Sequence, residues 1–85
     1  MSGVDGKVIA MHARKEFSRA SLDISRMDIA CLHGVINIYG WIGRLRGDNS
    51  EEEEDSVQGR IEKASERIKR IPGVREIVVY ARIRE

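Results

Sequence analysis

The stretch GVINIYGWI, residues 34–42, alternates aliphatic residues and glycine with polar and aromatic ones. Successive side chains of a β-strand point to opposite faces, so Ile36 and Ile38 share one face while Tyr39 and Trp41 share the other. A segment near the end of the chain, residues 74–84, repeats the pattern, with Ile77, Val79, Ala81 and Ile83 on one face and Val78, Tyr80, Arg82 and Arg84 on the other. One face of the predicted sheet is therefore aliphatic, and the other carries aromatic residues among arginines.

A third strand is predicted before these two. Residues 24–32 alternate in the same way and would place Met27, Ile29 and Cys31 on the aliphatic face. The dipeptide His33-Gly34 separates them from the strand that follows. Glycine supplies the positive φ that a two-residue turn requires, so we expect an antiparallel hairpin over residues 24–43.

Two helices are predicted from apolar residues at helical spacing. The first covers about residues 4–19, with Ile9, Ala13 and Phe17 on one side, although residues 7–11 also fit the start of a strand. The second covers about residues 51–71, with an apolar stripe of Val57, Ile61, Ala64, Ile68 and Ile71. Its start is predicted by capping patterns at Ser50-x-x-Glu53 or Asp55-x-x-Gln58, and its end by Pro72-Gly73.

The expected fold is an α/β (α+β) two-layer sandwich with the element order helix-strand-strand-helix-strand. A right-handed crossover makes the second and third strands parallel. We expect a three-stranded mixed sheet of order 2-1-3, with residues 24–32 in the centre and both helices on one face. The predicted core consists of Ile29, Ile36, Ile38, Val57, Ile61, Ile68, Ile77 and Val79. With 85 residues, the chain forms a single domain over residues 1–85.

Charge is unevenly distributed along the chain. Residues 1–47 hold seven Lys or Arg and four Asp or Glu, residues 48–55 hold six acids and no base, and residues 56–85 hold eight bases and four acids. The protein outside the acidic loop 48–55 is therefore basic, and a basic protein attracts anionic partners. The role of the acidic run stays open between helix capping and docking onto a basic patch of a neighbouring copy.

The sequence predicts neither an enzyme nor a cofactor or metal site. His12 and His33 have no second ligand at a defined short spacing, and His33 is expected to serve the hairpin turn. Cys31, the only cysteine, is expected to be a small core residue. The acidic loop lacks the glycine and the bidentate glutamate of a calcium loop. No apolar run is long enough to span a membrane and no leader pattern is present, so we expect a cytoplasmic protein.

Two surfaces are candidates for binding. The first is the sheet face opposite the helices, which carries Tyr39, Trp41 and Tyr80 together with Arg26, Arg82 and Arg84. A contact with a second copy or a partner protein, an anionic phospholipid surface, and a stacking platform for single-stranded nucleic acid each explain such a face, in that order of preference. The second is a possible anion stripe on the second helix, formed by Arg60, Lys63, Arg67 and Arg70.

The run Gly34-x-Ile36-x-Ile38-x-Gly40-x-Ile42 resembles the hairpin motif of the BON domain, a family named after bacterial osmotically induced and nodulation proteins. The helix from Val57 and the following Gly73-Val74-x-x-Ile77-x-Val79 resemble the family's second helix and last strand. The resemblance covers about residues 24–84. It implies the same sandwich, a binding role without enzymatic activity, and contact with phospholipid surfaces.

Overall fold

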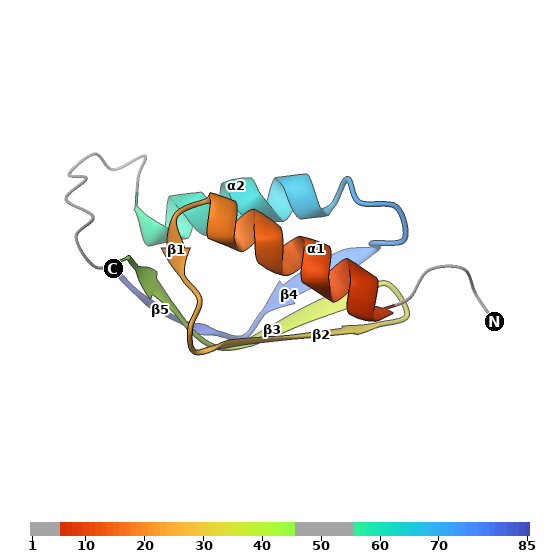
Figure 1. Ribbon diagram of the computed structural model, residues 1–85, viewed down its shortest axis with the longest axis horizontal. Coiled ribbons are helices and arrows are strands. Elements are labelled where there is room, and N and C mark those ends of the chain that lie inside the picture. Colours follow the sequence, from red (N-terminus) through yellow and green to blue (C-terminus); the bar gives the residue numbers. More distant parts are fainter. Residues whose placement is uncertain (1–5, 46–55) are drawn as a thin grey trace.

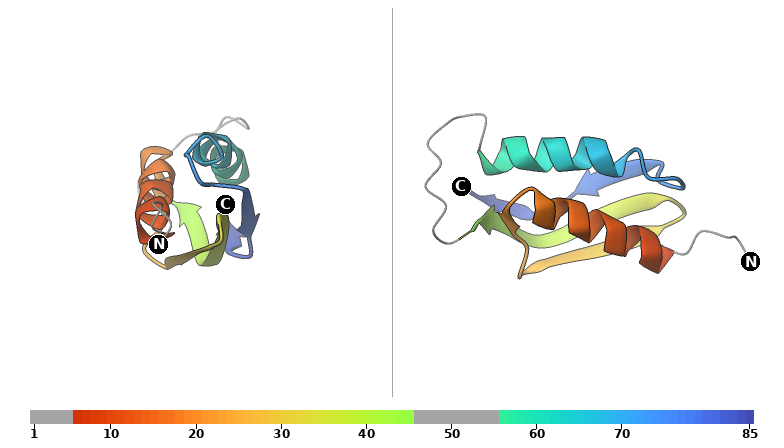
Figure 2. Two further views of the ribbon diagram at one scale, coloured as in Figure 1. Left: turned by 90° about the vertical axis from the view of Figure 1, so that its right-hand side faces the viewer. Right: turned by 45° about the horizontal axis from the view of Figure 1, so that its top comes forward.

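Two helices lie on one face of a mixed β-sheet in the computed structural model, which describes residues 6–45 and 56–85 (Figure 1). The elements follow in the order α1 (Gly6–Arg19), β1 (Leu22–Asp23), β2 (Met27–Leu32), β3 (Val35–Arg44), α2 (Val57–Ile68), β4 (Glu76–Val79) and β5 (Arg82–Arg84). Figure 2 shows both helices on the same side of the sheet, and no described element covers the other side. The predicted two-layer sandwich is confirmed, and its element order holds broadly, but the sheet formed by the described residues has five strands instead of three because of the short strand β1 and a divided last strand.

The ten-residue strand β3 is the centre of the sheet. It pairs antiparallel with β1 and β2 on one side and parallel with β4 and β5 on the other. The predicted order 2-1-3 is therefore wrong in one respect, because the second strand of the hairpin, not the first, lies in the middle. A central strand is covered by neighbours at both edges, which favours the more apolar strand of the hairpin. That strand is β3, because Ile36, Ile38 and Ile42 are fully buried, whereas Ile29 of β2 is only half-buried.

The hairpin turn between β2 and β3 consists of His33 and Gly34, both with positive φ, at 53° and 80°. Positive φ at both central residues defines the type I′ turn that matches the twist of paired strands. A Cβ atom on Gly34 would lie 2.6 Å from the Gly73 carbonyl oxygen, while the Gly34 carbonyl oxygen accepts a hydrogen bond of 2.7 Å from the Arg75 N–H. The turn expected at His33-Gly34 is confirmed, and it also anchors the start of β4.

Two predicted strands differ in extent from the observed ones, one being shorter and the other divided. The strand expected from residue 24 begins at Met27, because Ile24, Ser25 and Arg26 form a turn closed by a 3.1 Å hydrogen bond from the Met27 N–H to the Ile24 carbonyl oxygen. The strand expected over residues 74–84 is divided into β4 and β5, which keep one common register with β3. Tyr80 lies between them and still donates its N–H to the Ile38 carbonyl oxygen at 2.7 Å.

The described part of α2 is shorter than predicted and is capped differently. Ser56 is its N-cap, and the Ser56 hydroxyl accepts a hydrogen bond of 3.0 Å from the Gly59 N–H. The next two free N–H groups, of Val57 and Gln58, donate to the carboxylate of Glu85 at 2.9 and 3.3 Å. A carboxylate is favourable at this positive end of a helix. The cap predicted at Ser50 and the acidic run 48–55 lie outside the described residues, and so do Val4, Asp5 and Asp55.

The core lies between the two helices and the sheet. Five of its predicted members are buried: Ile36, Ile38, Val57, Ile61 and Ile68. The other three, Ile29, Ile77 and Val79, are partly buried and pack against it, as does Cys31. The predicted list lacked Phe17, a fully buried side chain of α1, and Leu22 of β1. Within the described ranges 6–45 and 56–85, no helix is long and apolar enough to cross a membrane.

Truncation of a core isoleucine tests this packing. Ile38→Ala and Ile68→Ala should each lower the free energy of unfolding by about 2–5 kcal/mol, because each removes a fully buried aliphatic side chain. Urea unfolding followed by circular dichroism measures the change. Met11→Ala is the matched control, since Met11 is 51% exposed on α1, and it should cost less than about 1 kcal/mol. Equal costs for the buried and the exposed site would contradict the packing.

Candidate functional site

The sheet face that points away from the helices, here called the open face, gathers the predicted aromatic residues and arginines. Ile38 lies opposite Val79, and Trp41 lies opposite Arg82 in the parallel pairing of β3 with β4 and β5. Residues opposite each other share a face. The alternation predicted from the sequence therefore holds across both strands and brings together Tyr39, Trp41, Tyr80, Arg82 and Arg84.

The rings of Tyr39 and Tyr80 stack on each other. Their centroids are 5.3 Å apart and their planes differ by 6°. An aromatic pair of this kind contributes about 0.5–1.5 kcal/mol beyond the area it buries. Both tyrosines remain exposed, at 44% and 60%, so the pair is formed on the surface before any partner arrives.

Trp41 is covered by arginine side chains of the neighbouring strand. The guanidinium carbon of Arg82 lies 5.4 Å from the centroid of the Trp41 ring, and that of Arg84 lies 5.0 Å from it. Both distances fall in the range of cation–π attraction. The open face thus has an aromatic middle, at Tyr39 and Tyr80, and a basic end, at Trp41 and the arginines.

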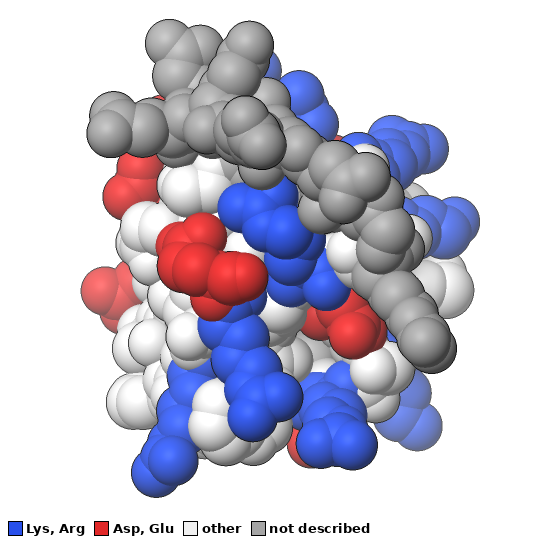
Figure 3. Space-filling view, turned by 90° about the vertical axis from the view of Figure 1, so that its left-hand side faces the viewer, with Lys and Arg blue, Asp and Glu red and all other residues white. Residues whose placement is uncertain are grey.

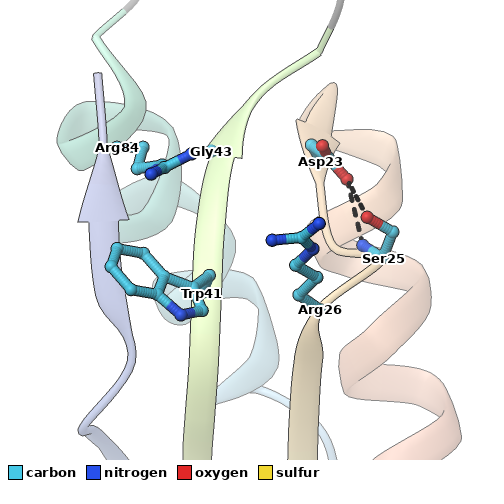
Figure 4. Close-up of a pocket in the computed structure, with 6 residues that line it drawn as sticks. All are labelled: Asp23, Ser25, Arg26, Trp41, Gly43 and Arg84. Atoms are coloured by element: carbon cyan, nitrogen blue, oxygen red, sulfur yellow. Dashed lines mark hydrogen bonds between the residues drawn. The ribbon is translucent and has the colours of Figure 1, made fainter.

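A cavity of about 370 Å³ lies at this basic end (Figure 4). We call it the β3-end notch. It is lined by Asp23, Ser25, Arg26, Trp41, Gly43 and Arg84. Figure 4 shows that Arg26 and Arg84 come from opposite sides of β3 and extend toward that strand. Arg26 was predicted as part of this surface, and the structure brings it to the same notch as Trp41 and Arg84.

The position of Arg26 depends on a bulge and on Gly40. Asp23 pairs with Gly43 of β3, and Met27 pairs with Gly40. Three residues lie between Asp23 and Met27, but only two lie between Gly40 and Gly43. The extra residue is a β-bulge, which re-aims the side chains around it. The Arg26 carbonyl oxygen accepts a 3.0 Å hydrogen bond from the Trp41 N–H, and a Cβ atom on Gly40, whose φ is +90°, would collide with this oxygen.

Asp23 holds the turn that precedes Arg26. Its carboxylate accepts hydrogen bonds from the Ser25 N–H at 3.0 Å and from the Ser25 hydroxyl at 2.7 Å. These bonds, and then the nearby charge of Arg26, hold the pKa of Asp23 below its ordinary value. The carboxylate is therefore ionised at neutral pH and is turned toward Ser25, as Figure 4 shows.

The arginines of the notch are not neutralised by ion pairs with other described residues. The ion pairs between described residues join Arg19 to Glu16 at 3.6 Å and Arg44 to Glu85 at 3.7 Å. Arg82 and Arg84 contact Trp41 instead, and the charge that influences Asp23 is that of Arg26. Figure 3 shows Lys and Arg side chains gathered at this end of the molecule, with a smaller number of acids between them.

The predicted anion stripe on α2 is a separate surface, and Arg60 has a structural role in it. Arg60 is half-buried and donates a hydrogen bond of 3.1 Å to the Ser21 carbonyl oxygen, which ties α2 to the turn after α1. Lys63, Arg67 and Arg70 are exposed. Lys63 and Arg67 lie on α2 and Arg70 in the turn after it, so the structure does not bring them to the open face.

The remaining candidate residues stay dispersed. His12 is exposed on α1, and His33 is exposed in the hairpin turn. Among the residues that the structure describes, no group of three His, Cys, Asp or Glu side chains is placed to hold a metal ion. Two further hollows lie between α2 and the β4–β5 edge, at about 410 Å³, and beside the hairpin turn, at about 540 Å³. Neither combines two arginines with an aromatic ring, as the β3-end notch does.

Sequence reasoning missed three residues of the notch and both residues that cap α2, Ser56 and Glu85. Asp23 and Ser25 carry a recognisable signal, since an Asp-x-Ser pattern is typical of a turn closed by the Asp side chain. Gly43 contributes by lacking a side chain, which the sequence pattern does not reveal. Glu85 caps α2 across the fold, and no local pattern indicates such a distant contact.

A scan against models of protein families, a search of curated proteins and a search of solved structures each found no match. The resemblance to the BON domain stays a prediction.

Substitution of Gly40 tests the local geometry of the notch. Gly40→Ala should lower the free energy of unfolding by about 1–3 kcal/mol or more, because it forces a side chain into positive φ and against the Arg26 carbonyl oxygen. Gly43→Ala is the control, since its Cβ atom would lie 3.6 Å from the Cβ of Arg84, an ordinary contact. Chemical unfolding of both variants provides the comparison, and equal stability of the two would contradict the close approach.

The turn at Asp23 can be tested by titration. Ser25→Ala removes the hydroxyl donor, so the pKa of Asp23 should rise toward its ordinary value of 3.8. Carboxyl-carbon NMR measures this pKa, and Ser65→Ala, which changes a serine of α2, should leave it unchanged. Because folding lowers this pKa, the stabilisation from the turn is complete above pH 3.8 and is lost as the pH falls through the lowered value. An Asp23 pKa that is the same with and without the Ser25 hydroxyl would refute the assignment.

Proposed function

We propose that this protein is a non-catalytic binding module whose open face docks against a second copy of the chain. The observation that carries the proposal is the exposed Tyr39–Tyr80 stack on a sheet face that no described element covers. Leu32, at the end of β2, adds a side chain that is 66% exposed. A small protein rarely leaves such an apolar and aromatic surface in water without a partner.

The composition of the open face suits a protein interface. Tyrosine, tryptophan and arginine are the residues most enriched in the centres of such interfaces. The tyrosines are stacked and Trp41 is held under two guanidinium groups before binding. Ordering them on binding therefore costs little conformational entropy.

The charges of the face favour a second copy over a polyanion. Asp28 lies opposite Tyr39, and Glu76 lies opposite Val35, so two acids share the face with Arg82 and Arg84. Carboxylates at these positions would oppose an anionic membrane or a nucleic-acid backbone. A face with both signs of charge can meet its own copy without general repulsion.

The ring arrangement also disfavours a platform for nucleic-acid bases. One face of each tyrosine ring is occupied by the other ring, and two guanidinium groups lie over Trp41. Bases stack on free aromatic faces. The open face instead offers ring edges and hydroxyl groups, which suit contact with side chains of another protein.

The absence of catalysis is part of the proposal and is supported by the chemistry of the notch. Its charged groups are two arginines and one carboxylate held by Ser25, and neither His nor Cys is among its lining residues. We also propose a cytoplasmic location, which suits the single free thiol of Cys31.

Sedimentation equilibrium over micromolar to millimolar concentrations tests the proposal. The chain should show a concentration-dependent mass, and Tyr80→Ala should weaken the association about tenfold or more, as expected for a central aromatic residue of an interface. Met11→Ala, which removes an exposed apolar side chain from the helical layer, is the matched control and should leave the association unchanged.

Three results would contradict the proposal. The chain could remain monomeric at every concentration, or Met11→Ala could weaken the association as much as Tyr80→Ala. Binding of the monomer to anionic vesicles or to single-stranded oligonucleotides that requires Tyr80 would assign the face to a membrane or a nucleic acid instead.

A further inference from the structure

We propose that the β3-end notch is a binding site for a phosphate monoester group carried on a small organic molecule. The site is distinct from the aromatic middle of the open face, and the inference does not depend on the proposed self-association. It rests on the charge, the fixed geometry and the size of the notch.

The charge of the notch favours a phosphate group. Arg26 and Arg84 extend toward β3 from opposite sides, and neither forms an ion pair with another described residue. A guanidinium group presents paired N–H donors that match two phosphate oxygens. Two arginines on opposite walls can therefore hold different oxygens of one phosphate group, and the nearby Arg82 adds a further positive charge at this end.

The backbone of the notch and the Arg84 side chain are positioned before any ligand binds. The hydrogen bond from the Trp41 N–H to the Arg26 carbonyl oxygen, together with Gly40, holds the bulge that carries Arg26 against β3. Arg84 lies over the Trp41 ring at 5.0 Å. Ligand binding then has mainly the exposed Arg26 side chain left to order, which limits its entropic cost.

The acid in the notch is turned away from the proposed ligand. Asp23 accepts two hydrogen bonds from Ser25, and Figure 4 shows it beyond Arg26 as seen from Trp41. Its charge reduces the positive potential of the notch without cancelling both arginines. A doubly charged phosphate group is consequently attracted more strongly than a singly charged carboxylate.

The size of the notch indicates more than a bare anion. Its volume of about 370 Å³ falls within the range of small-molecule sites, which starts at about 300 Å³. Gly43 adds no side-chain atoms to the lining, and Trp41, beside the arginines that lie over its ring, is the aromatic residue of the lining. A phosphate carried on a small organic group fits both features, whereas free phosphate would use the arginines alone.

Nitrogen–proton NMR titration with phenyl phosphate and with inorganic phosphate tests the site. Trp41 is the only tryptophan, so its indole N–H signal reports on the notch without ambiguity, and the Gly43 amide gives a second signal. Both signals should shift and saturate, and phenyl phosphate should bind more tightly than inorganic phosphate. Sodium chloride at matched ionic strength is the control for general charge screening.

Arg26→Gln should weaken phenyl phosphate binding about tenfold, the effect of losing one charge-assisted contact. The fold should survive, because the backbone of Arg26, not its guanidinium group, bonds to Trp41. Arg26→Lys keeps the charge without the paired donors. Its affinity for phenyl phosphate should therefore lie between those of the unmodified protein and Arg26→Gln. Arg67→Gln removes the same charge from the helical layer and should leave binding unchanged.

An equal loss of binding in Arg67→Gln, shifts that grow without saturating, or inorganic phosphate that binds as tightly as phenyl phosphate would each overturn the proposal. Phosphate binding is measured from the Trp41 and Gly43 signals, and self-association is measured by sedimentation. Either proposal can therefore be refuted while the other holds.

Discussion

The strict alternation of side chains along β3 is the constraint on which the rest of the structure depends. This strand has neighbours at both edges, so each of its residues must point either into the helical layer or out of the sheet. Ile36, Ile38 and Ile42 fill the core and are fully buried. The same alternation forces Tyr39 and Trp41 outward, and the common register of β4 and β5 aligns Tyr80 and the two arginines beside them.

The open face is therefore a consequence of core formation. A shift of β3 by one residue would expose its isoleucines and turn Tyr39 and Trp41 toward the helices, which would destabilise the fold. The Tyr39–Tyr80 stack and the arginines over Trp41 need no dedicated loop to position them. Their positions follow from β3, whose core face is fully buried, and from the register that β4 and β5 keep with it.

The alternation explains why so much of the face could be predicted from the sequence. Side-chain direction on a strand is a local property, so the group formed by Tyr39, Trp41, Tyr80, Arg82 and Arg84 follows from spacing alone. The position of the central strand does not, because it depends on which edge of the hairpin the last strand joins. Burial favours β3 as the central strand of the hairpin, because it has the larger apolar face and the central position has neighbours at both edges.

Departures from regular structure supply the parts that spacing could not predict. The bulge before Met27 brings Arg26 to the same notch as Trp41, and Gly40 permits the close approach. The C-terminal Glu85 caps α2 from the far end of the sequence. Each of these contacts joins segments that are distant along the chain or breaks the pattern of a strand, so a periodicity argument misses it.

The exposure of the tyrosine stack tests the central claim most directly. A soluble nitroxide broadens the NMR signals of rings that it can approach, and the ring signals of Tyr39 and Tyr80 can be followed in dilute and in concentrated samples. The account predicts strong broadening in the dilute protein and protection in the concentrated protein. Rings that are protected at both concentrations, or broadened equally at both, would contradict an open face that is covered by a second copy.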